Sequence, residues 1–461
     1  MTEVACENRA KERWLVIAPI FNCDGRAASQ TVTDKLPRLK HEAIELTVVS
    51  GVTGEKDASL VHKQVWSLSP SGLRFDLRHI VSRRHGRGWK YRVITGIASL
   101  LLSPAILVER MLVGVAGHWG WSVPAAISAC LAVRTNRPDV LFSSGGPVSA
   151  HLAGWIAHRL TGIPWVAEIH DPIVERPEPE SRMVAWAMMR ERWLRRILES
   201  LICRDASLAW WFTENALSSA SRRNPNLGAR GFRILPGSQP SGQPTQHVYS
   251  THLTIGHFGI LSDTRSLAEF VHGLAAFLSR HPEARRLVRV SVYGSALDPR
   301  ARASIQAHQL DDLVKVFGRV ELNPATGESG RTHVNRMMQE CDALLLLHGH
   351  LPRCAEYIPS KVYEYFWARR AVFALVHLND ELTSLVRNFG GIAVTSTDPV
   401  SVAAGLKELW SRWQSRQLQV PPVQPISAWD ATGEIVSRVR RALRNQSLTA
   451  AHARGSASRA S

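Results

Sequence analysis

Two glutamates, Glu356 and Glu364, lie eight positions apart in the second half of the 461-residue chain, with a Pro-Ser-Lys segment between them. Pro359 suits the first turn of a helix, because its missing N–H would have no partner there. The backbone N–H groups of Ser360 and Lys361 would then point out of a helix N-terminus, an arrangement that binds phosphate. One carboxylate could hold a sugar and the other a ribose, with a diphosphate between them.

The spacing of the two glutamates is weak evidence by itself. Glutamates eight apart are common by chance, and the alternative is a loop residue at 356 and a solvated helix residue at 364. The Pro-Ser-Lys segment, however, follows the apolar run 343–347 after a short loop. Ligands of open α/β sheets bind where a strand ends and a helix begins, so this context favours a binding site.

The elements that would position these residues are short runs rich in valine, isoleucine and leucine, which alternate with helical patterns. Such runs are typical of parallel strands buried on both faces. They are residues 14–19, 44–50, 139–144, 165–169 and 207–213, then 253–258, 288–293, 314–317, 343–347, 372–376 and 392–395. The alternation predicts an α/β protein with two doubly wound, Rossmann-like domains.

A stretch rich in Pro, Gly, Ser and Gln, residues 236–246, has the composition of an interdomain linker. The predicted parts are an N-terminal domain (1–236), a C-terminal domain (247–425), a helix packing back toward the N-terminal domain (426–446) and a disordered tail (447–461). If the two domains face each other, their strand-end loops line a cleft, and chemistry is expected there.

The formal net charge is +17, which attracts anions such as nucleic acid, acidic lipid or phosphorylated substrates. The densest basic run, residues 83–92, directly precedes the apolar stretch 93–108, and this order favours a membrane surface over nucleic acid. The N-terminus lacks an apolar signal core. We therefore expect a cytoplasmic protein, peripheral at the inner face of the plasma membrane, with residues 83–121 as the membrane-associating segment.

The apolar stretch 93–108 is shorter than the ~20 residues that a membrane-spanning helix needs, and Pro104 interrupts it. An interfacial helix is the favoured interpretation, with a core helix or a true span as the alternatives. The six cysteines are scattered without metal-ligand spacing and are expected to be reduced thiols.

Residues 356–365, Glu-Tyr-Ile-Pro-Ser-Lys-Val-Tyr-Glu-Tyr, resemble the Glu-x7-Glu donor motif of the family 4 retaining glycosyltransferases. Residues 138–154, with their Pro-Asp-Val and Ser-Ser-Gly-Gly-Pro segments, and the turn at 168–172 are also similar to that family. The resemblance covers roughly residues 14–50 and 138–440. It implies the GT-B fold, in which two Rossmann-like domains face each other across a cleft.

The resemblance also implies roles for the donor-site residues. Glu356 would contact hydroxyls of the transferred sugar, Ser360 and Lys361 the diphosphate, and Glu364 the ribose. Arg265 falls where such enzymes carry a basic residue on the diphosphate. The family usually has another arginine directly after the glycine at 259, and this chain has Ile260 instead.

Further strand-end positions belong to the expected cleft. Gly25 would let the backbone approach a phosphate or an acceptor. The resemblance implies that the loops of Gly294 and of Gly318 and Arg319 flank the base and the phosphates, with Gly259 at the neighbouring strand end. The loop of Gly25 could equally be an ordinary βα turn.

His170 could form a polar wall of the acceptor pocket. Asp171 could accept a proton from an acceptor hydroxyl, or it could simply cap the turn before Pro172.

The expected function is transfer of a sugar, of the hexosyl type, from a nucleoside-diphosphate sugar to a polyprenyl-diphosphate-linked or oligosaccharide acceptor, with retention of configuration. No Asp-x-Asp motif is present, so no obligatory metal or other cofactor is expected, and no nucleic-acid partner. The alternatives are a sugar-nucleotide epimerase, or a basic binding protein for membrane or nucleic acid with a degenerate transferase site.

Overall fold

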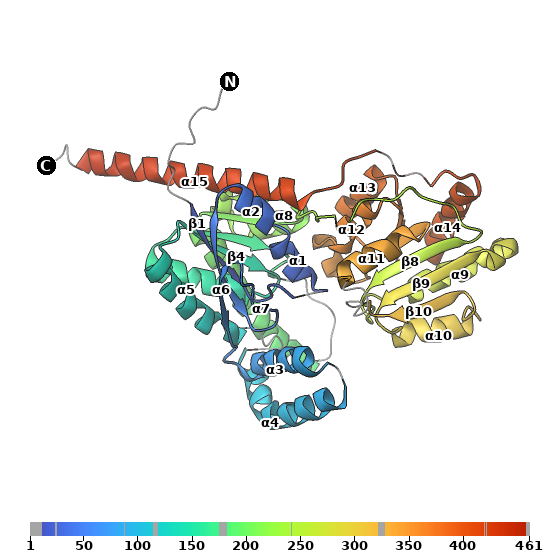
Figure 1. Cartoon of the computed structure of the whole chain (residues 1–461), viewed down its shortest axis with the longest axis horizontal. Helices are drawn as coiled ribbons and strands as arrows, with labels where there is room; N and C mark the ends of the chain where they lie inside the picture. Colours follow the sequence, from blue (N-terminus) through green and yellow to red (C-terminus); the bar gives the residue numbers. More distant parts are fainter. Residues whose placement is uncertain are drawn as a thin grey trace, which may run out of the picture.

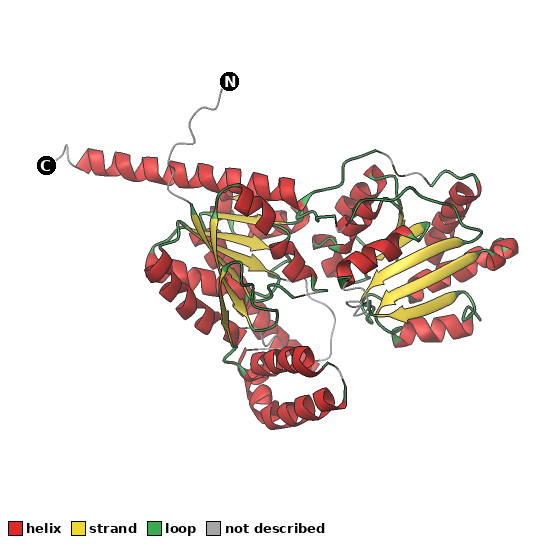
Figure 2. Ribbon diagram, viewed as in Figure 1, coloured by secondary structure: helices red, strands yellow, loops and turns green. Residues whose placement is uncertain are grey.

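The computed structural model describes residues 12–23, 25–86, 88–113, 119–174, 182–240, 242–320, 328–418, 420 and 422–457, and within these the side chains of 182–187 and 447–457 are not described. Figure 1 shows two α/β halves joined at one side, with a long C-terminal helix lying along the N-terminal half. Figure 2 shows a twisted sheet inside each half, covered by helices.

The N-terminal domain is built on a seven-stranded sheet in the order β3-β2-β1-β4-β5-β6-β7, in which every paired strand is parallel. Its inner strands are buried on both faces, as the continuous apolar runs predict; all six residues of β4 are buried. The strands are β1 (Arg13–Ala18), β2 (Glu45–Gly51), β3 (Val61–Val65), β4 (Val140–Gly145), β5 (Trp165–Ile169), β6 (Leu208–Trp211) and β7 (Gly231–Arg233).

Eight helices accompany this sheet in the described residues. They are α1 (Ala27–Thr33), α2 (Leu36–His41), α3 (Pro70–His85), α4 (Trp89–Val113), α5 (Ser122–Asn136), α6 (Ser149–Thr161), α7 (Arg182–Asp205) and α8 (Glu214–Arg223). The helices α3 and α4 form a hairpin that projects from the bottom of the domain in Figure 1. It is this hairpin that carries the predicted membrane segment.

The C-terminal domain has a six-stranded parallel sheet in the order β10-β9-β8-β11-β12-β13. The strands are β8 (Leu253–Gly259), β9 (Val288–Gly294), β10 (Val314–Gly318), β11 (Ala343–Leu347), β12 (Ala371–Val376) and β13 (Ile392–Thr395). The helices are α9 (Ala268–Arg280), α10 (Pro299–Ala307), α11 (Gly330–Gln339), α12 (Lys361–Ala368), α13 (Asp380–Asn388) and α14 (Pro399–Gln414). A separate apolar core fills each face of this sheet.

The chain crosses between the domains twice, and the two crossings pair side by side. Ser238, in the predicted linker, forms a parallel bridge with Ser427, just before α15 (Ala428–Ala457). Gly237 has a φ of +63°, and a Cβ there would collide with the backbone of Ser427. Both connections between the domains therefore pass through one place.

Helix α15 packs back on the N-terminal domain, where Ala431, Ile435, Val436 and Val439 join the apolar core. Disorder was expected from residue 447, and the structure continues α15 to Ala457. This segment is rich in alanine, the strongest helix former, which favours propagation of a helix that has already started.

Every predicted strand is present, and two strands were missed. β3 lies at the edge of its sheet and has mostly half-exposed side chains, so its sequence lacks the continuous apolar run that marks a buried strand. β7 is only three residues long. Both omissions lie at the margins of the sheet, and the strands that end at the cleft were predicted.

Candidate active site

The strand-end loops of the two domains meet at Gly25 and Arg319. Gly25 has a φ of +66°, and a Cβ on it would lie 3.0 Å from Nη2 of Arg319. Gly318, with a φ of +74°, turns the chain just before the arginine. The structure therefore brings together three residues that the sequence assigned to the cleft from opposite domains.

Gly259 and Gly294 end neighbouring strands, β8 and β9, and are register partners. A Cβ on Gly294 would collide with the backbone of Gly259, so this close approach requires glycine. The following loop is fixed by the Leu261 N–H, which donates to Ser295 Oγ at 2.9 Å. Ile260, at the position of the expected arginine, is 65% exposed and brings no charge to the strand end.

The helix after β11 begins two residues later than predicted. Ser360 is its N-cap, and its side chain makes no capping hydrogen bond, so Pro359 lies just outside the helix. Lys361 Nζ lies 2.8 Å from Glu364 Oε2, which pairs two predicted donor-site residues directly. Tyr365 fixes the helix to the sheet, because its hydroxyl accepts from the Phe258 N–H and donates to the Leu345 carbonyl.

Glu356 is buried at the domain boundary and is only 3% exposed. Its Oε1 accepts a hydrogen bond of 2.7 Å from Ser219 Oγ on α8. Its carbonyl accepts another from Thr213 Oγ1, also 2.7 Å, and Asn215 Nδ2 donates to the neighbouring Ala355 carbonyl at 2.8 Å. The C-terminal-domain carboxylate predicted to hold the sugar is thus seated against the N-terminal domain.

The loop that carries Glu356 is held by residues that sequence reasoning did not single out. His348 donates from Nε2 to the Tyr357 carbonyl at 3.0 Å, and its Nδ1 accepts from the His377 N–H. Asn379 Nδ2 donates to the carbonyls of Cys354 and Tyr357. Burial lowers the pKa of His348 to about 4, so this imidazole is neutral at pH 7 and holds the loop in place through its two hydrogen bonds.

Arg265 lies in the loop after β8, where its backbone pairs with Ser262 in both directions. Its charge acts on three groups around the donor loop: it lowers the pKa values of His257, His348 and Tyr357 relative to what burial alone would give. Lys361 acts on His257 in the same way. Two of the three predicted diphosphate ligands, Arg265 and Lys361, therefore both act on His257, on β8.

On the N-terminal side, a fully buried ion pair stands behind His170. Lys35 Nζ lies 3.0 Å from Glu168 Oε1, and the two side chains are 2% and 0% exposed. Ser144 Oγ donates to the same carboxylate, and His170 Nε2 is 3.2 Å from Glu168 Oε2. Burial by itself raises the pKa of Glu168, but Lys35, His170 and Ser144 outweigh it and lower the pKa to about 2.

His170 is linked to Glu356 through two intervening residues. Its ring stacks on Phe212 with centroids 4.8 Å apart, and the next residue, Thr213, holds the Glu356 carbonyl. The predicted acceptor wall and the predicted sugar ligand thus belong to one continuous set of contacts. Lys35 could not be found from its neighbours in sequence, because it lies 133 positions before Glu168.

Asp171 is exposed at the end of β5, and its carboxylate oxygen lies where a Cβ on Gly146 would come within 2.6 Å. It therefore faces the loop after β4. His151, on α6, is structural: Nδ1 is 3.0 Å from Ser143 Oγ and Nε2 is 3.2 Å from the Gly145 carbonyl. Burial lowers the pKa of His151 to about 4.

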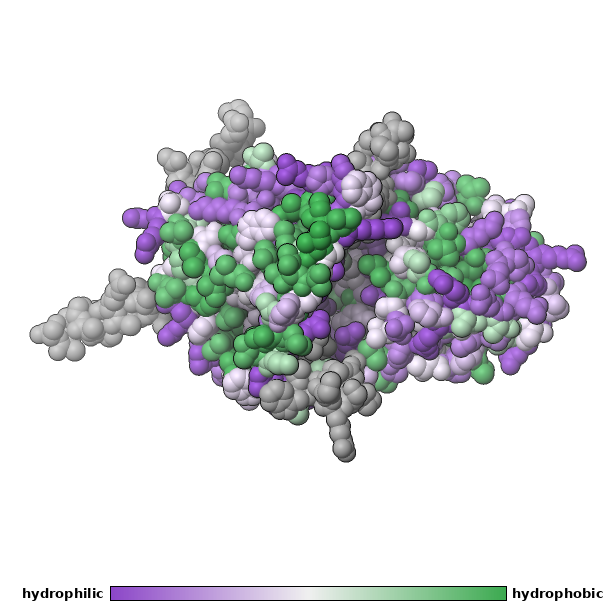
Figure 3. All heavy atoms as spheres, turned by 90° about the horizontal axis from the view of Figure 1, so that it is seen from below, coloured by the Kyte–Doolittle hydropathy of each residue, from purple (hydrophilic) through white to green (hydrophobic). Residues whose placement is uncertain are grey.

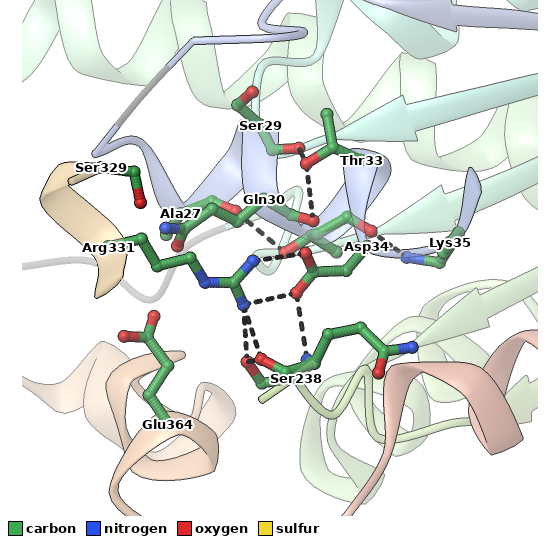
Figure 4. Close-up of polar contacts among 12 residues, drawn as sticks. Ala27, Ser29, Gln30, Thr33, Asp34, Lys35, Ser238, Ser329, Arg331 and Glu364 are labelled. Carbon is green, nitrogen blue, oxygen red and sulfur yellow. Dashed lines mark hydrogen bonds and ion pairs between the residues drawn. The ribbon is translucent and has the colours of Figure 1, made fainter. Parts of the chain in front are cut away.

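An interdomain ion pair, here called the clasp, lies beside the donor motif. Arg331 at the start of α11 makes a two-pronged contact with Asp34 at the end of α1, at 2.6 and 2.8 Å. The same guanidinium donates to Ser238 Oγ and the Gln239 carbonyl of the linker. Figure 4 shows these contacts, with the Glu364 carboxylate directed toward Arg331.

No group of three or more His, Cys, Asp or Glu side chains that could hold a metal occurs among the residues that the structure describes. The charged side chains predicted for the cleft include Arg265, Lys361, Arg319 and the two glutamates of the donor motif.

Residues 71–225 match the model of a glycosyl transferase 4-like domain. No curated protein matches the chain in sequence. TarM of S. aureus, solved with UDP, is similar with a TM-score of 0.55 at 10% identity, over 94% of this chain and 100% of that one. Trehalose 6-phosphate synthase of Burkholderia multivorans is similar with a TM-score of 0.54 at 12% identity, over 98% of this chain and 100% of that one. UDP-GlcNAc 2-epimerase from Neisseria meningitidis has a TM-score of 0.47 at 11% identity, over 93% of this chain and 100% of that one.

These comparisons confirm the predicted fold class. The two facing parallel-sheet domains form a GT-B fold, and the match to the glycosyl transferase 4-like model lies within the N-terminal domain. At identities of 10–12%, these structures show the fold of this chain and no more specific property.

Proposed function

We propose that this protein is a glycosyltransferase that moves a sugar from a nucleoside-diphosphate sugar to a lipid-linked or saccharide acceptor, with retention of configuration. The observation that carries the proposal is the start of α12, where Ser360 and Lys361 stand between Glu356 and Glu364 with Arg265 nearby. Backbone N–H groups and two cations suit a diphosphate, and the flanking carboxylates suit hydroxyl groups.

In this proposal the C-terminal domain holds the donor and the N-terminal domain receives the acceptor. The leaving nucleoside diphosphate is an anion, and Arg265, Lys361 and the helix N-terminus would stabilise its charge without a metal. Glu356 would orient the sugar, which converts transfer into a reaction between groups already in place. His170 and Asp171 would line the acceptor side.

The base of the nucleotide would lie at the end of β10, beside Gly318 and Arg319. Three aromatic rings stack there in sequence: Phe258 on Tyr293 at 4.7 Å, and Tyr293 on Phe317 at 4.8 Å. Phe317 is 56% exposed, so the stack ends in an accessible ring. Aromatic faces of this kind bind bases by stacking.

A donor screen tests the proposal. UDP-, GDP-, ADP- and dTDP-sugars are compared for their effect on the melting temperature, and we expect one of them to stabilise the protein by about 2.7 kcal/mol at a hundred times its dissociation constant. UDP-sugars come first, because TarM was solved with UDP. The same donor is then incubated with candidate acceptors to detect the product.

No shift with any nucleotide would refute donor binding and leave a basic binding protein. A donor that binds and is isomerised without any acceptor would show an epimerase instead.

The acceptor is proposed to lie in the membrane surface, because the α3–α4 hairpin presents an apolar face to solvent. α4 is 25 residues long and, among the described residues, is the helix long and apolar enough to cross a membrane; only 11% of its most apolar window is buried. This exposure supports an interfacial helix rather than a core helix. Figure 3, seen from the hairpin side, shows the green apolar area on the N-terminal domain.

α4 is tied to α3 near the C-terminal end of α4 and near its middle. Ser71 donates to Glu109 from its N–H at 2.8 Å and from its hydroxyl at 2.6 Å, and Arg78 donates to Ser99. A helix held to its own domain in this way suits the plane of the membrane surface better than a path across it. The hairpin also carries exposed basic side chains, which anionic lipid attracts: Arg84, Lys90, Arg92 and Arg110.

Helix α7 extends the apolar face beyond the segment that the sequence indicated. Met189 and Trp193 are 61% and 60% exposed and line a pocket of about 460 Å³ against Leu112 of α4. We propose that this face docks on the anionic inner leaflet, where a lipid-linked acceptor would be presented to the cleft.

Replacing Leu100 and Leu101 with aspartate is expected to reduce sedimentation with anionic phospholipid vesicles at least about tenfold, because both side chains are nearly three-quarters exposed on α4. Leu160→Asp, equally exposed but alone on α6, is the matched control and should sediment like the unaltered protein. Nucleotide binding should be unchanged in both. If the unaltered protein stays in the supernatant, membrane docking is excluded.

A further inference from the structure

The imidazole of His257 carries a buried nitrogen that has no partner. His257 lies on β8 and is 4% exposed. Its Nδ1 is 3.1 Å from the Leu345 carbonyl, which can only accept, so Nδ1 bears a hydrogen. Nε2, on the far side of the ring, makes no hydrogen bond.

An unsatisfied buried nitrogen costs about 1–3 kcal/mol and calls for an explanation. The direction of Nε2 supplies one. It lies 3.4 Å from the position of a Cβ on Gly259, the last residue of β8. The ring therefore points along its strand toward the carboxyl end, the edge at which parallel α/β sheets bind ligands.

The surroundings of the ring indicate the chemical class of the missing partner. Arg265, from the loop after β8, and Lys361, from the start of α12, are the charged groups that act on His257. Its register partner on β9 is the apolar Val292. Two cations and a histidine nitrogen around one strand end form a site for a phosphate group, and Ile260 leaves the arginine position beside it uncharged.

We propose that His257 donates a hydrogen bond from Nε2 to the diphosphate of the donor, taking up one proton from solvent as the nucleotide sugar binds. The inference rests on the proposed function and adds a residue to it. The protonated ring would bridge the Leu345 carbonyl and a phosphate oxygen. On release of the nucleoside diphosphate the proton returns to solvent, so no other reactant is needed.

The expected change in the pKa of His257 on binding has the sign that this hydrogen bond requires. In the free protein, burial lowers the pKa of His257 to about 4; Arg265 and Lys361 lower it further, and the Leu345 carbonyl opposes them. A bound diphosphate offsets the two cations and raises the pKa. Because the complex then holds more protons than its parts, affinity falls as pH rises above about 4, by at most about tenfold per pH unit, until the pKa of the complex is passed.

Isothermal titration of the full chain at pH 5.5, in two buffers of different ionisation enthalpy, measures the proton uptake. The probe is UDP-N-acetylglucosamine, or the nucleotide sugar that replaces it in the donor screen; its diphosphate diester does not titrate in this range. We expect uptake of close to one proton by the unaltered protein.

Three variants separate the hydrogen bond from the titration. His257→Gln can donate without titrating, so it should bind the nucleotide sugar within a fewfold of normal and take up almost no proton. His257→Leu should bind at least about tenfold more weakly. His308→Gln removes an exposed histidine at the end of α10 and should behave like the unaltered protein.

Binding with the same proton uptake in His257→Gln as in the unaltered protein would overturn the inference and leave the proposed function standing, as would binding without uptake by the unaltered protein. Absence of any nucleotide binding would instead overturn the proposed function, and the inference with it. Melting curves of each variant show whether it is folded, and His257→Gln keeps the test decisive if His257→Leu is not.

Discussion

Replacing Lys35 with methionine is expected to lower the free energy of unfolding by about 3–5 kcal/mol, because it leaves a fully buried carboxylate without its counter-ion. Lys35 and Glu168 are 2% and 0% exposed and 3.0 Å apart, so water cannot take over the role of the ammonium group. Urea or thermal denaturation of the purified variant measures the change. The effect should be among the largest of any single substitution in the N-terminal domain.

The pH dependence of the same pair has a defined sign. The pKa of Glu168 is lowered to about 2, below its ordinary value of 4.5. The stability that its charged form contributes is therefore complete above about pH 4.5 and is lost as pH falls toward 2. In the Lys35→Met variant this acid-dependent loss should become smaller.

Two further variants show whether the cause is an unpaired charge. Lys35→Met combined with Glu168→Gln should recover much of the lost stability, because no charge is then left buried. Arg285→Met removes the exposed pair with Asp312, whose side chains are 40% and 60% exposed, and should cost less than about 1 kcal/mol. A loss as large as that of Lys35→Met in this control would contradict the explanation.

Replacing Glu356 with glutamine is expected to reduce kcat about 10²–10³-fold, the range found when one preorganised group that stabilises a transition state is removed. Glutamine keeps the size of the side chain and its contact with Ser219, so the fold should survive. The measurement is product formation with the donor identified by the screen. Full activity of this variant would remove Glu356 from the site.

Ser219→Ala is the matched control for that experiment, because it removes the partner of Glu356 Oε1 and leaves the carboxylate. It should change kcat by less than about tenfold. Glu364→Gln should act differently again: this residue is assigned to the ribose, so it should chiefly weaken binding of the nucleotide sugar. Equal effects of all three substitutions would indicate a structural role for the region.

The central strands were predictable because a strand that is buried on both faces consists almost entirely of apolar residues. β4 and β11 read as unbroken apolar runs, since both faces of a central parallel strand are covered. β3 was not predicted, because an edge strand is partly exposed and needs no continuous apolar run. The continuation of α15 to Ala457 was not predicted, because the composition of an alanine-rich segment suits a helix as well as a disordered chain.

The candidate site was predictable where its residues are close in sequence or lie in strand-end loops, as Gly25, Gly318 and Arg319 do. The donor motif lies within ten positions, and Lys361 indeed pairs with Glu364. The partner of Glu356, Ser219, lies 137 positions away. The ion pair of Lys35 and the free nitrogen of His257 depend on strand order and ring orientation, which no local pattern encodes.

The paired crossings at Ser238 and Ser427 determine how the cleft can open. Because both connections between the domains pass through one place, a relative movement is a rotation about it. The clasp is attached to this axis through Ser238 and therefore lies close to it. Gly25 lies beyond the opposite end of α1, about 10 Å farther out at 1.5 Å per residue. Rotation by a few degrees would separate Gly25 from Arg319 more than it separates Asp34 from Arg331, so a nucleotide sugar of the proposed kind would enter first at the end where the base is proposed to lie.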